Sequence, residues 1–280
     1  MKATRADGLR ENRRSQASRR VVQQRLMFKF ERPDLLTLPS REIHLSYARL
    51  HAPPMVIRSL LEVLSRDERE RAARFHFDRH REAFIISRGL LRSILCLYTG
   101  VPPDKLVFIY GAKGKPSLPD SSIYFNLSHS KDVALYAVAR EPLLGVDVEW
   151  IRPMSDAESI AKRFFSPAEY AEVMALDEKT RSLGFLNCWT RKEAYVKAVG
   201  DGLHVPLDEF QVSLMPGQQA IFHSINGDRE RAARWSLFDV RPTEGYVGAL
   251  AVYGRGWRLR HCTYTSDVLK AHADARCATL

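Results

Sequence analysis

Two similar signals for the start of a helix stand 101 positions apart in this chain. Ser65 and Ser166 are each followed three residues later by a glutamate, Glu68 and Glu169. This spacing is that of a capping box, in which the serine and glutamate side chains bond the free backbone N–H groups of the first helical turn. An alternating strand pattern precedes each box, and a long helical pattern that ends at glycine follows it. The repeated order of elements indicates an internal duplication, although a coincidence of common signals is the alternative.

The hydrophobic periodicity predicts the elements of both copies. In the first copy we expect a strand, a short helix, a long helix and a strand at 41–50, 65–75, 79–98 and 106–110. In the second copy we expect the same order at 144–150, from 166, at 182–199 and at 210–214. Further strands are expected at 123–127, 133–139, 220–224, 235–240 and 246–253. The predicted fold is therefore α+β, with two similar lobes at 41–140 and 141–265 related by a pseudo-twofold axis. Ligand sites favour such interfaces, so we expect the active site at the seam.

The composition is typical of a globular protein. With 280 residues, 45% of them hydrophobic, it can bury a sizeable core. It has no apolar run of about 18 residues and no apolar segment of a secretory signal near its start, so we expect no membrane contact. The four cysteines are scattered without a paired spacing, which is typical of reduced thiols in a cytoplasmic protein.

The positive charge is concentrated near the N-terminus. Up to Arg25 there are eight basic and two acidic side chains, so this segment carries +6 of the net +10. We expect residues 1–27 to form a disordered basic arm and residues 266–280 a loose tail. The arm has three interpretations: a solvated tail, a segment ahead of a true start at Met27, or a tether to nucleic acid or a membrane surface. The remaining charge, near +4, slightly favours anionic partners.

Acidic side chains on two predicted elements suggest a metal site. Asp147 and Glu149 are two apart on a strand and so share one face. On the long helix, Trp189, Glu193 and Lys197 recur every four residues and so share one stripe. If Glu193 faces the strand, three carboxylates converge, and two such charges about 4 Å apart repel by about 4 kcal/mol at an effective dielectric of about 20. Oxygen ligands favour Mg²⁺, with Mn²⁺ as the alternative, completed by phosphate oxygens. An exposed strand face and a surface Glu–Lys pair are the structural alternatives.

Three further features could bind a phosphate, and each also has an ordinary structural interpretation. His129 is expected in a turn at 128–132, where it could donate to a phosphate, act as a base, or simply stabilise the turn. Lys113, Gly114 and Lys115 form a basic turn without the ending of a Walker loop. Arg71 lies at a basic helix start, which is either a solvated face or a phosphate clamp.

Taken together, these stretches resemble the 4′-phosphopantetheinyl transferases of the large, two-lobed, surfactin-synthetase-activating type. Gly145-Val-Asp147-Val-Glu149 resembles the first family signature, and Trp189-x-x-Lys192-Glu193-Ala194-x-x-Lys197 resembles the second. Gly114-Lys115-Pro116 and Asn126-Leu127-Ser128-His129-Ser130 also fit in order. The resemblance covers about residues 41 to 215.

The resemblance implies an activity. The enzyme would move the 4′-phosphopantetheine arm of coenzyme A onto a serine of an apo carrier protein (acyl, peptidyl or aryl) and release 3′,5′-ADP. Asp147, Glu149 and Glu193 match the family's metal ligands. The positions implied for the nucleotide and pyrophosphate are Lys113, Gly114, Lys115, Asn126, Ser128, His129 and Lys197. Arg71 matches a basic position near the 3′-phosphate, whereas Glu68 stands where some members carry lysine.

The implied chemistry leaves one role open and two other functions to test. Glu193 would take the proton of the acceptor serine, directly or through a water on the metal, or would serve as a ligand only. Lys197 would stabilise the departing phosphate oxygen, and His129 is the third catalytic candidate. The carrier would dock near the helix expected at 164–176, and a monomer is expected because two internal lobes supply both walls. The alternatives are a Mg²⁺-dependent nucleotide-pyrophosphate hydrolase and a non-enzymatic nucleic-acid binder that uses the basic arm, although the body shows no nucleic-acid reader pattern.

Overall fold

The structure, a computed structural model, describes residues 35–200 and 205–263. The predicted arm at 1–27 and tail at 266–280 lie outside the described residues. The elements of the first half are β1 (Glu42–Arg49), α2 (Pro54–Glu62), α3 (Arg66–Ala73), α4 (Asp78–Thr99), the 3-10 turn η1 (Pro103–Lys105), β2 (Ile109–Tyr110), β3 (Pro116–Ser117), β4 (Tyr124–Ser130) and β5 (Val133–Ala139). Those of the second half are β6 (Leu144–Trp150), α5 (Ala157–Phe164), α6 (Pro167–Ala175), α7 (Glu178–Val199), the 3-10 turn η3 (Leu207–Glu209), β7 (Phe210–Val212), β8 (Phe222–Ile225), α8 (Arg229–Ala233), β9 (Trp235–Val240), β10 (Tyr246–Tyr253) and β11 (Arg258–His261).

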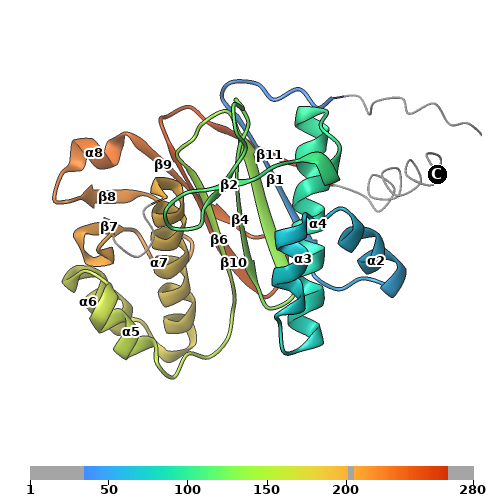
Figure 1. The fold of residues 1–280 in the computed structure, drawn as a ribbon. Coiled ribbons are helices and arrows are strands. Elements are labelled where there is room, and N and C mark those ends of the chain that lie inside the picture. The colour runs from blue at the N-terminus through green and yellow to red at the C-terminus, as the bar shows by residue number, and fades with distance from the viewer. Residues whose placement is uncertain (1–34, 201–204, 264–280) are drawn as a thin grey trace, which may run out of the picture. The chain divides into compact units, whose positions relative to one another are not determined.

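The two halves repeat one topology, which confirms the predicted duplication. In the first half the strand order is β1–β5–β4, and in the second it is β6–β10–β9. In both, the first strand pairs antiparallel with the last, and the last pairs antiparallel with the strand before it. The long helices α4 and α7 occupy equivalent places and flank the central strands from opposite sides (Figure 1). Strand β11 departs from the repeat, because it returns to the first sheet and pairs parallel with β1.

Several local predictions need correction. Helices α2 and α5 were not predicted. The strand expected at 106–110 is reduced to β2, because the Leu106 N–H donates to the Pro102 carbonyl at the end of η1. The helix expected at 164–176 is observed as α6, which begins at the capping box of Ser166, whereas α5 ends at Phe164. His129 lies on β4 and not in a turn; the turn begins at Lys131, whose φ is 52°. No helix within the described ranges is long and apolar enough to span a bilayer.

A buried ion pair ties the first capping box to α4. Glu68 caps the first turn of α3 by accepting from the Ser65 N–H, and it is 2% exposed. Its Oε2 lies 2.6 Å from Nε of Arg92. The same guanidinium donates to the carbonyls of Pro103 and Leu106, at 2.8 and 2.9 Å, around η1. One buried cation thus fixes α3, α4 and η1 to one another.

The second half contains the same arrangement with lysine as the cation. Glu169 caps α6, and its Oε2 lies 2.8 Å from Nζ of Lys192 on α7. The ammonium also donates to the carbonyls of Leu207 and Phe210, at 2.6 and 2.5 Å, around η3. Lys192 belongs to the second signature, and its position assigns it this structural role.

The seam between the halves runs along β4 and β6, where side chains make the polar contacts. The Asn126 amide oxygen accepts from the Val146 N–H at 2.9 Å, and the Ser130 hydroxyl accepts from the Trp150 N–H at 3.1 Å. Helix α7 approaches β6 so closely that a Cβ at Gly145 would lie 2.1 Å from the Ala194 carbonyl oxygen. The glycine of the first signature therefore permits the contact that brings α7 over the acidic strand.

Candidate active site

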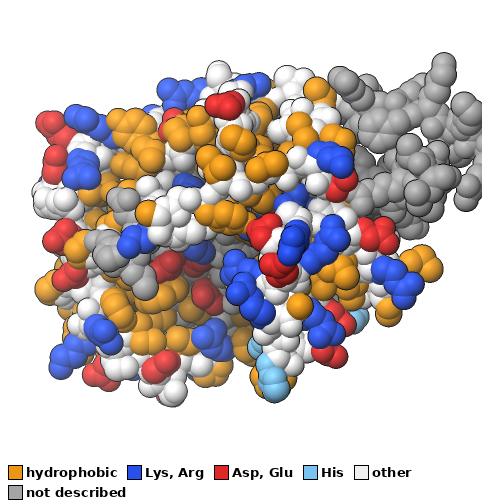
Figure 2. All heavy atoms as spheres, in the orientation of Figure 1, with side chains coloured by type: hydrophobic (Ala, Val, Ile, Leu, Met, Phe, Trp, Pro, Cys, Tyr) orange, Lys and Arg blue, Asp and Glu red, His pale blue; other side chains and the backbone are white. Residues whose placement is uncertain are grey.

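A cavity of about 470 Å³ lies at the seam, between α3 and α4 of the first half and α7 of the second. Figure 2 shows the corresponding hollow, with acidic side chains inside it and basic side chains along its edge. Every residue expected to bind the nucleotide or pyrophosphate lines this cavity, namely Arg71, Lys113, Gly114, Lys115, Asn126, Ser128, His129 and Lys197, and so does Glu193. The structure therefore brings together groups that are up to 126 positions apart in sequence.

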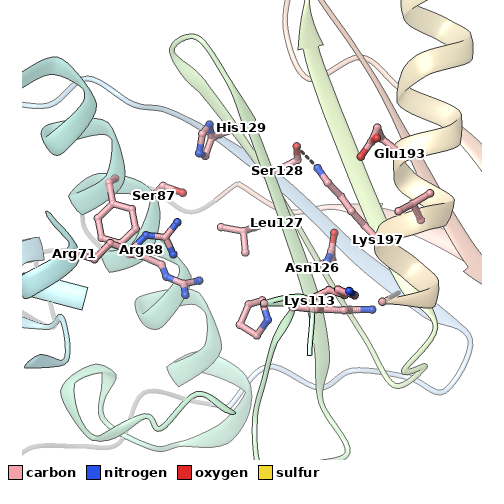
Figure 3. Close-up of a pocket in the computed structure, with 16 residues that line it drawn as sticks. Arg71, Ser87, Arg88, Lys113, Asn126, Leu127, Ser128, His129, Glu193 and Lys197 are labelled. Carbon is pink, nitrogen blue, oxygen red and sulfur yellow. Dashed lines mark hydrogen bonds between the residues drawn. The ribbon is translucent and has the colours of Figure 1, made fainter. Parts of the chain in front are cut away.

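Lys197 is paired with Asp147 on the α7 side of the cavity. The ammonium Nζ lies 2.6 Å from Asp147 Oδ1 and 2.8 Å from the Ser128 hydroxyl oxygen, as Figure 3 shows for the latter contact. The Ser128 hydroxyl in turn donates to Asp147 Oδ1 at 2.8 Å. The other oxygen, Asp147 Oδ2, is buried and has no hydrogen-bond partner. One carboxylate oxygen of Asp147 is thus hydrogen-bonded, and the other is available to a ligand.

Glu149 and Glu193 experience the charge of this aspartate. The Ser130 hydroxyl donates to Glu149 Oε2 at 2.7 Å. Burial raises the pKa of Glu149, and the negative charge of Asp147 adds to the rise. For Glu193 burial again raises the pKa, followed by repulsion from Asp147 and a smaller contribution from Glu149. The three carboxylates, all in the second half, therefore lie near enough for their charges to interact.

The oxygen atoms of these carboxylates are suitable ligands for a divalent cation, although the side chains do not converge on a single point. Within residues 35–200 and 205–263, no three His, Cys, Asp or Glu side chains form a cluster that could hold a metal ion as they stand. The Lys197 ammonium supplies a positive charge among these carboxylates. The unpartnered Asp147 Oδ2 and the oxygen-only donor set suit Mg²⁺ better than a softer transition metal.

His129 and Lys115 both line the cavity, but His129 lies on β4 and the Lys115 ammonium is held by backbone carbonyls. Loss of hydration, followed by the charge of Lys197, lowers the pKa of His129 and favours the neutral imidazole. Lys115 directs its ammonium at backbone carbonyls, 2.9 Å from that of Ala198 and 3.1 Å from that of Leu144. Burial lowers its pKa to about 8. Its side chain lines the cavity while its charge is bound to the end of α7.

Arg88 and Phe84 were not predicted; both lie on α4 and line the cavity. Figure 3 shows Arg88 on the wall opposite Lys197. The Arg88 side chain is only 7% exposed. Its signal in the sequence was present: Phe84, Arg88 and Arg92 recur every four residues on a helix that is otherwise apolar over this stretch. An arginine repeated on the buried stripe of such a helix needs a buried partner.

Comparison with known proteins agrees with the two-lobed fold. The family model described as the 4′-phosphopantetheinyl transferase superfamily matches residues 143–251, and that of the 4′-phosphopantetheinyl transferase N-terminal region matches residues 51–141. The two matches meet between β5 and β6.

Three relatives illustrate the range of similarity. The chain is 42% identical to the 4′-phosphopantetheinyl transferase HetI of Nostoc sp., over 83% of this chain and 97% of the relative. It is 33% identical to the 4′-phosphopantetheinyl transferase Sfp of Bacillus subtilis, over 58% of this chain and 71% of the relative. It is 26% identical to the mouse L-aminoadipate-semialdehyde dehydrogenase-phosphopantetheinyl transferase, over 72% of this chain and 71% of the relative. The chain belongs to the 4′-phosphopantetheinyl transferase superfamily, and within it to the two-lobed type.

Proposed function

We propose that this chain transfers the 4′-phosphopantetheine arm of coenzyme A to a serine of an apo carrier protein and releases 3′,5′-ADP. The observation that supports the proposal is the presence of acidic and basic side chains in one cavity. Glu193 lies on one side with Lys197, which is paired with Asp147, while Arg71 and Lys113 supply positive charge elsewhere along the wall. A substrate with several phosphates and a hydroxyl nucleophile is the chemistry that such a cavity suits.

The proposed reaction exchanges one bond to phosphorus for another. The acceptor serine oxygen bonds to the phosphorus that carries the pantetheine, and the bond from that phosphorus to the bridging oxygen breaks. That oxygen leaves with the electron pair as part of 3′,5′-ADP. Glu193 takes the serine proton, and its raised pKa makes it a stronger base than an ordinary glutamate. Lys197 donates to the departing oxygen, and Ser128 and His129 orient the pyrophosphate.

Asp147, Glu149 and Glu193 would hold Mg²⁺, with Mn²⁺ as the alternative ion. When bound, the ion supplies positive charge that neutralises the pyrophosphate as negative charge builds on it. Asp147 Oδ2 is the ligand atom that the structure leaves unpartnered. This assignment keeps Glu193 available both as a ligand and as the base, and the geometry favours neither role alone.

The test is a carrier mass assay. The full chain is incubated with coenzyme A, Mg²⁺ and acyl, peptidyl or aryl carrier proteins in their apo forms, and the mass of each carrier is measured. We expect a gain of one phosphopantetheine arm and release of 3′,5′-ADP. No gain on any carrier would contradict the proposal. Release of 3′,5′-ADP at the same rate without a carrier would instead identify a hydrolase of nucleotide pyrophosphates.

Two further parts of the proposal concern partners. One chain supplies both walls of the cavity, so we propose that a monomer is sufficient for activity; light scattering at assay concentration tests this. The carrier is expected to be acidic and to approach from the side of α5 and α6. A smaller hollow of about 160 Å³ beside α5 is lined by Glu149, Arg152 and Trp189, among others, next to the acidic strand.

A further inference from the structure

The turn between β4 and β5, together with the last residue of β4, contacts the second half, and we call residues 130–132 the clasp. The Ser130 hydroxyl donates to Glu149 Oε2 at 2.7 Å and accepts from the Trp150 N–H at 3.1 Å. The Lys131 ammonium lies 3.5 Å from the centre of the Trp150 ring. The clasp thus contacts both Glu149 and the residue that follows it.

Asp132 attaches the clasp to β10. One of its carboxylate oxygens accepts from the Tyr246 hydroxyl, and the other lies 2.7 Å from Nη1 of Arg49. Tyr246 is 4% exposed, and it pairs with Trp150 in the ladder between β10 and β6. Arg49 also donates to the Thr243 hydroxyl at 3.4 Å. Arg49 therefore bridges the equivalent connections of the two halves, β4–β5 and β9–β10.

Lys131 has a backbone conformation that lysine seldom adopts. Its φ is 52°, in the left-handed region that favours glycine and asparagine. Residues held in this region cluster at functional sites. Here the lysine puts a cation on the face of Trp150, next to the proposed metal ligand Glu149. The ammonium is therefore a contribution to this turn that glycine could not make.

The Glu149 carboxylate has two neighbours that would orient it differently. Its Oε2 lies 2.7 Å from the Ser130 hydroxyl and 3.8 Å from Nη1 of Arg152, which is too far for a hydrogen bond. The Glu149 side chain is 26% exposed, so packing alone does not fix it. Arg152 lines the smaller hollow beside α5 and not the cavity that contains Glu193. Without the Ser130 hydroxyl, Glu149 would instead pair with Arg152.

We propose that the clasp keeps the Glu149 carboxylate in the orientation in which it shares a metal ion with Asp147. This inference rests on the proposed function, which makes both carboxylates ligands. Ser130 contacts the ligand, and Lys131 and Asp132 are positioning residues that hold Ser130 against β6. Loss of a hydrogen-bonded neighbour of a metal ligand lowers metal affinity about 10- to 100-fold. The clasp therefore sets the affinity for Mg²⁺, although none of its three residues lines the larger cavity.

The test measures Mg²⁺ affinity by calorimetric titration of the full chain without coenzyme A. We expect Ser130→Ala to weaken Mg²⁺ binding about 10-fold. Tyr246→Phe, which removes one hydroxyl, should weaken it about two- to fivefold. Lys131→Asn should weaken it by a similar factor, although asparagine suits the backbone of this turn better than lysine does. Lys131→Arg should keep most of the affinity, because a cation remains over the ring.

Two further variants separate positioning from a general loss of structure. Arg140→Met removes hydrogen bonds to Leu38 and Ser122 beyond the opposite end of β5 and should leave Mg²⁺ affinity unchanged. Arg152→Met, added to Ser130→Ala, should recover part of the lost affinity, because Glu149 loses its alternative partner. In turnover, the clasp variants should need more Mg²⁺ for half-maximal rate, while KM for coenzyme A at saturating Mg²⁺ matches the wild type.

The outcomes distinguish the clasp from the proposed function. Wild-type Mg²⁺ affinity in Ser130→Ala, or in both Lys131→Asn and Tyr246→Phe, would overturn the clasp. An equal loss in Arg140→Met, or no recovery with Arg152→Met, would overturn it too. A wild-type chain that binds Mg²⁺ but modifies no carrier would overturn the proposed function alone, and one that binds no Mg²⁺ would overturn both.

Discussion

The Nζ of Lys197 lies 2.6 Å from Oδ1 of Asp147, so the second signature places an ammonium directly on the first. Both residues come from stretches that are 50 positions apart in the chain. The lysine offsets the charge of a nearly buried carboxylate, which would otherwise repel Glu193 on the same helix. A metal ion held at Asp147 would therefore experience a competing positive charge from Lys197.

Removing that competing charge should separate metal affinity from turnover. We expect Lys197→Met to bind Mg²⁺ more tightly than the wild type when no coenzyme A is present, because one repelling charge is gone. Turnover should fall about 10²- to 10³-fold, since the departing oxygen loses a donor. Calorimetry with Mg²⁺ and the carrier mass assay measure the two effects. Lys113→Met is the control, and weaker Mg²⁺ binding by Lys197→Met would contradict the assignment.

The raised pKa of Glu193 predicts an unusual pH dependence of stability in EDTA. Burial and Asp147 raise this pKa above 4.5, so between that value and the raised one the native state binds more protons at Glu193 than the unfolded chain does. The contribution of Glu193 to stability therefore falls as pH rises through this interval. Glu193→Gln should gain thermal stability relative to the wild type as pH rises, and Mg²⁺ should reduce the difference near neutrality. A difference that is constant with pH would show that Glu193 is not desolvated.

Lys192 and Glu193 are neighbours in the signature, but substitution of Lys192 should mainly lower stability, whereas substitution of Glu193 should mainly lower turnover. Lys192→Met leaves the buried Glu169 without its cation and should cost about 3–5 kcal/mol of unfolding free energy. Glu193→Gln should abolish most turnover at little cost in stability. Urea unfolding and the carrier assay measure both. If the double variant Lys192→Met, Glu169→Gln is not more stable than Lys192→Met alone, the ion pair is not the reason.

Gly145→Ala tests the close contact between α7 and β6. The added Cβ would meet backbone atoms of Ala194 and Ala198, which cannot rotate away, so α7 must shift. We expect a loss of about 1–3 kcal/mol and a fall in kcat of up to about 10²-fold as Glu193 is displaced from the acidic strand. Gly111→Ala is the control, because its Cβ would make only an ordinary contact at 3.8 Å. Normal turnover in Gly145→Ala would contradict this account.

Local signals predicted the elements well where periodicity and capping agreed. Strand β5 was expected at its observed bounds, and both capping boxes begin helices as predicted. Helix α2 was not predicted, although Pro54 stands at its first helical position, where the proline ring is favourable. Strand β11 could not be predicted, because its pairing with β1 joins distant parts of the chain.

The site was predictable in its members but not in their contacts. Spacing placed Asp147 and Glu149 on one strand face, and both meet serine hydroxyls of β4 there. Spacing could not show that the Lys115 ammonium donates to backbone carbonyls, since that contact depends on where α7 ends. Arg88 was missed for the related reason that its partners, Glu68 and Tyr110, come from separate elements.

The polar contacts along the seam have a consequence for how the molecule could be divided. Ser128 and Ser130 of the first sheet donate hydrogen bonds to Asp147 and Glu149 of the second. A change in the alignment of the halves would therefore also change the geometry of these carboxylates. Cutting the backbone between β5 and β6 would turn this alignment from an intramolecular event into a bimolecular one. Two co-expressed fragments would then regain turnover only in proportion to their association, and catalysis would become a direct measure of how tightly the halves recognise each other.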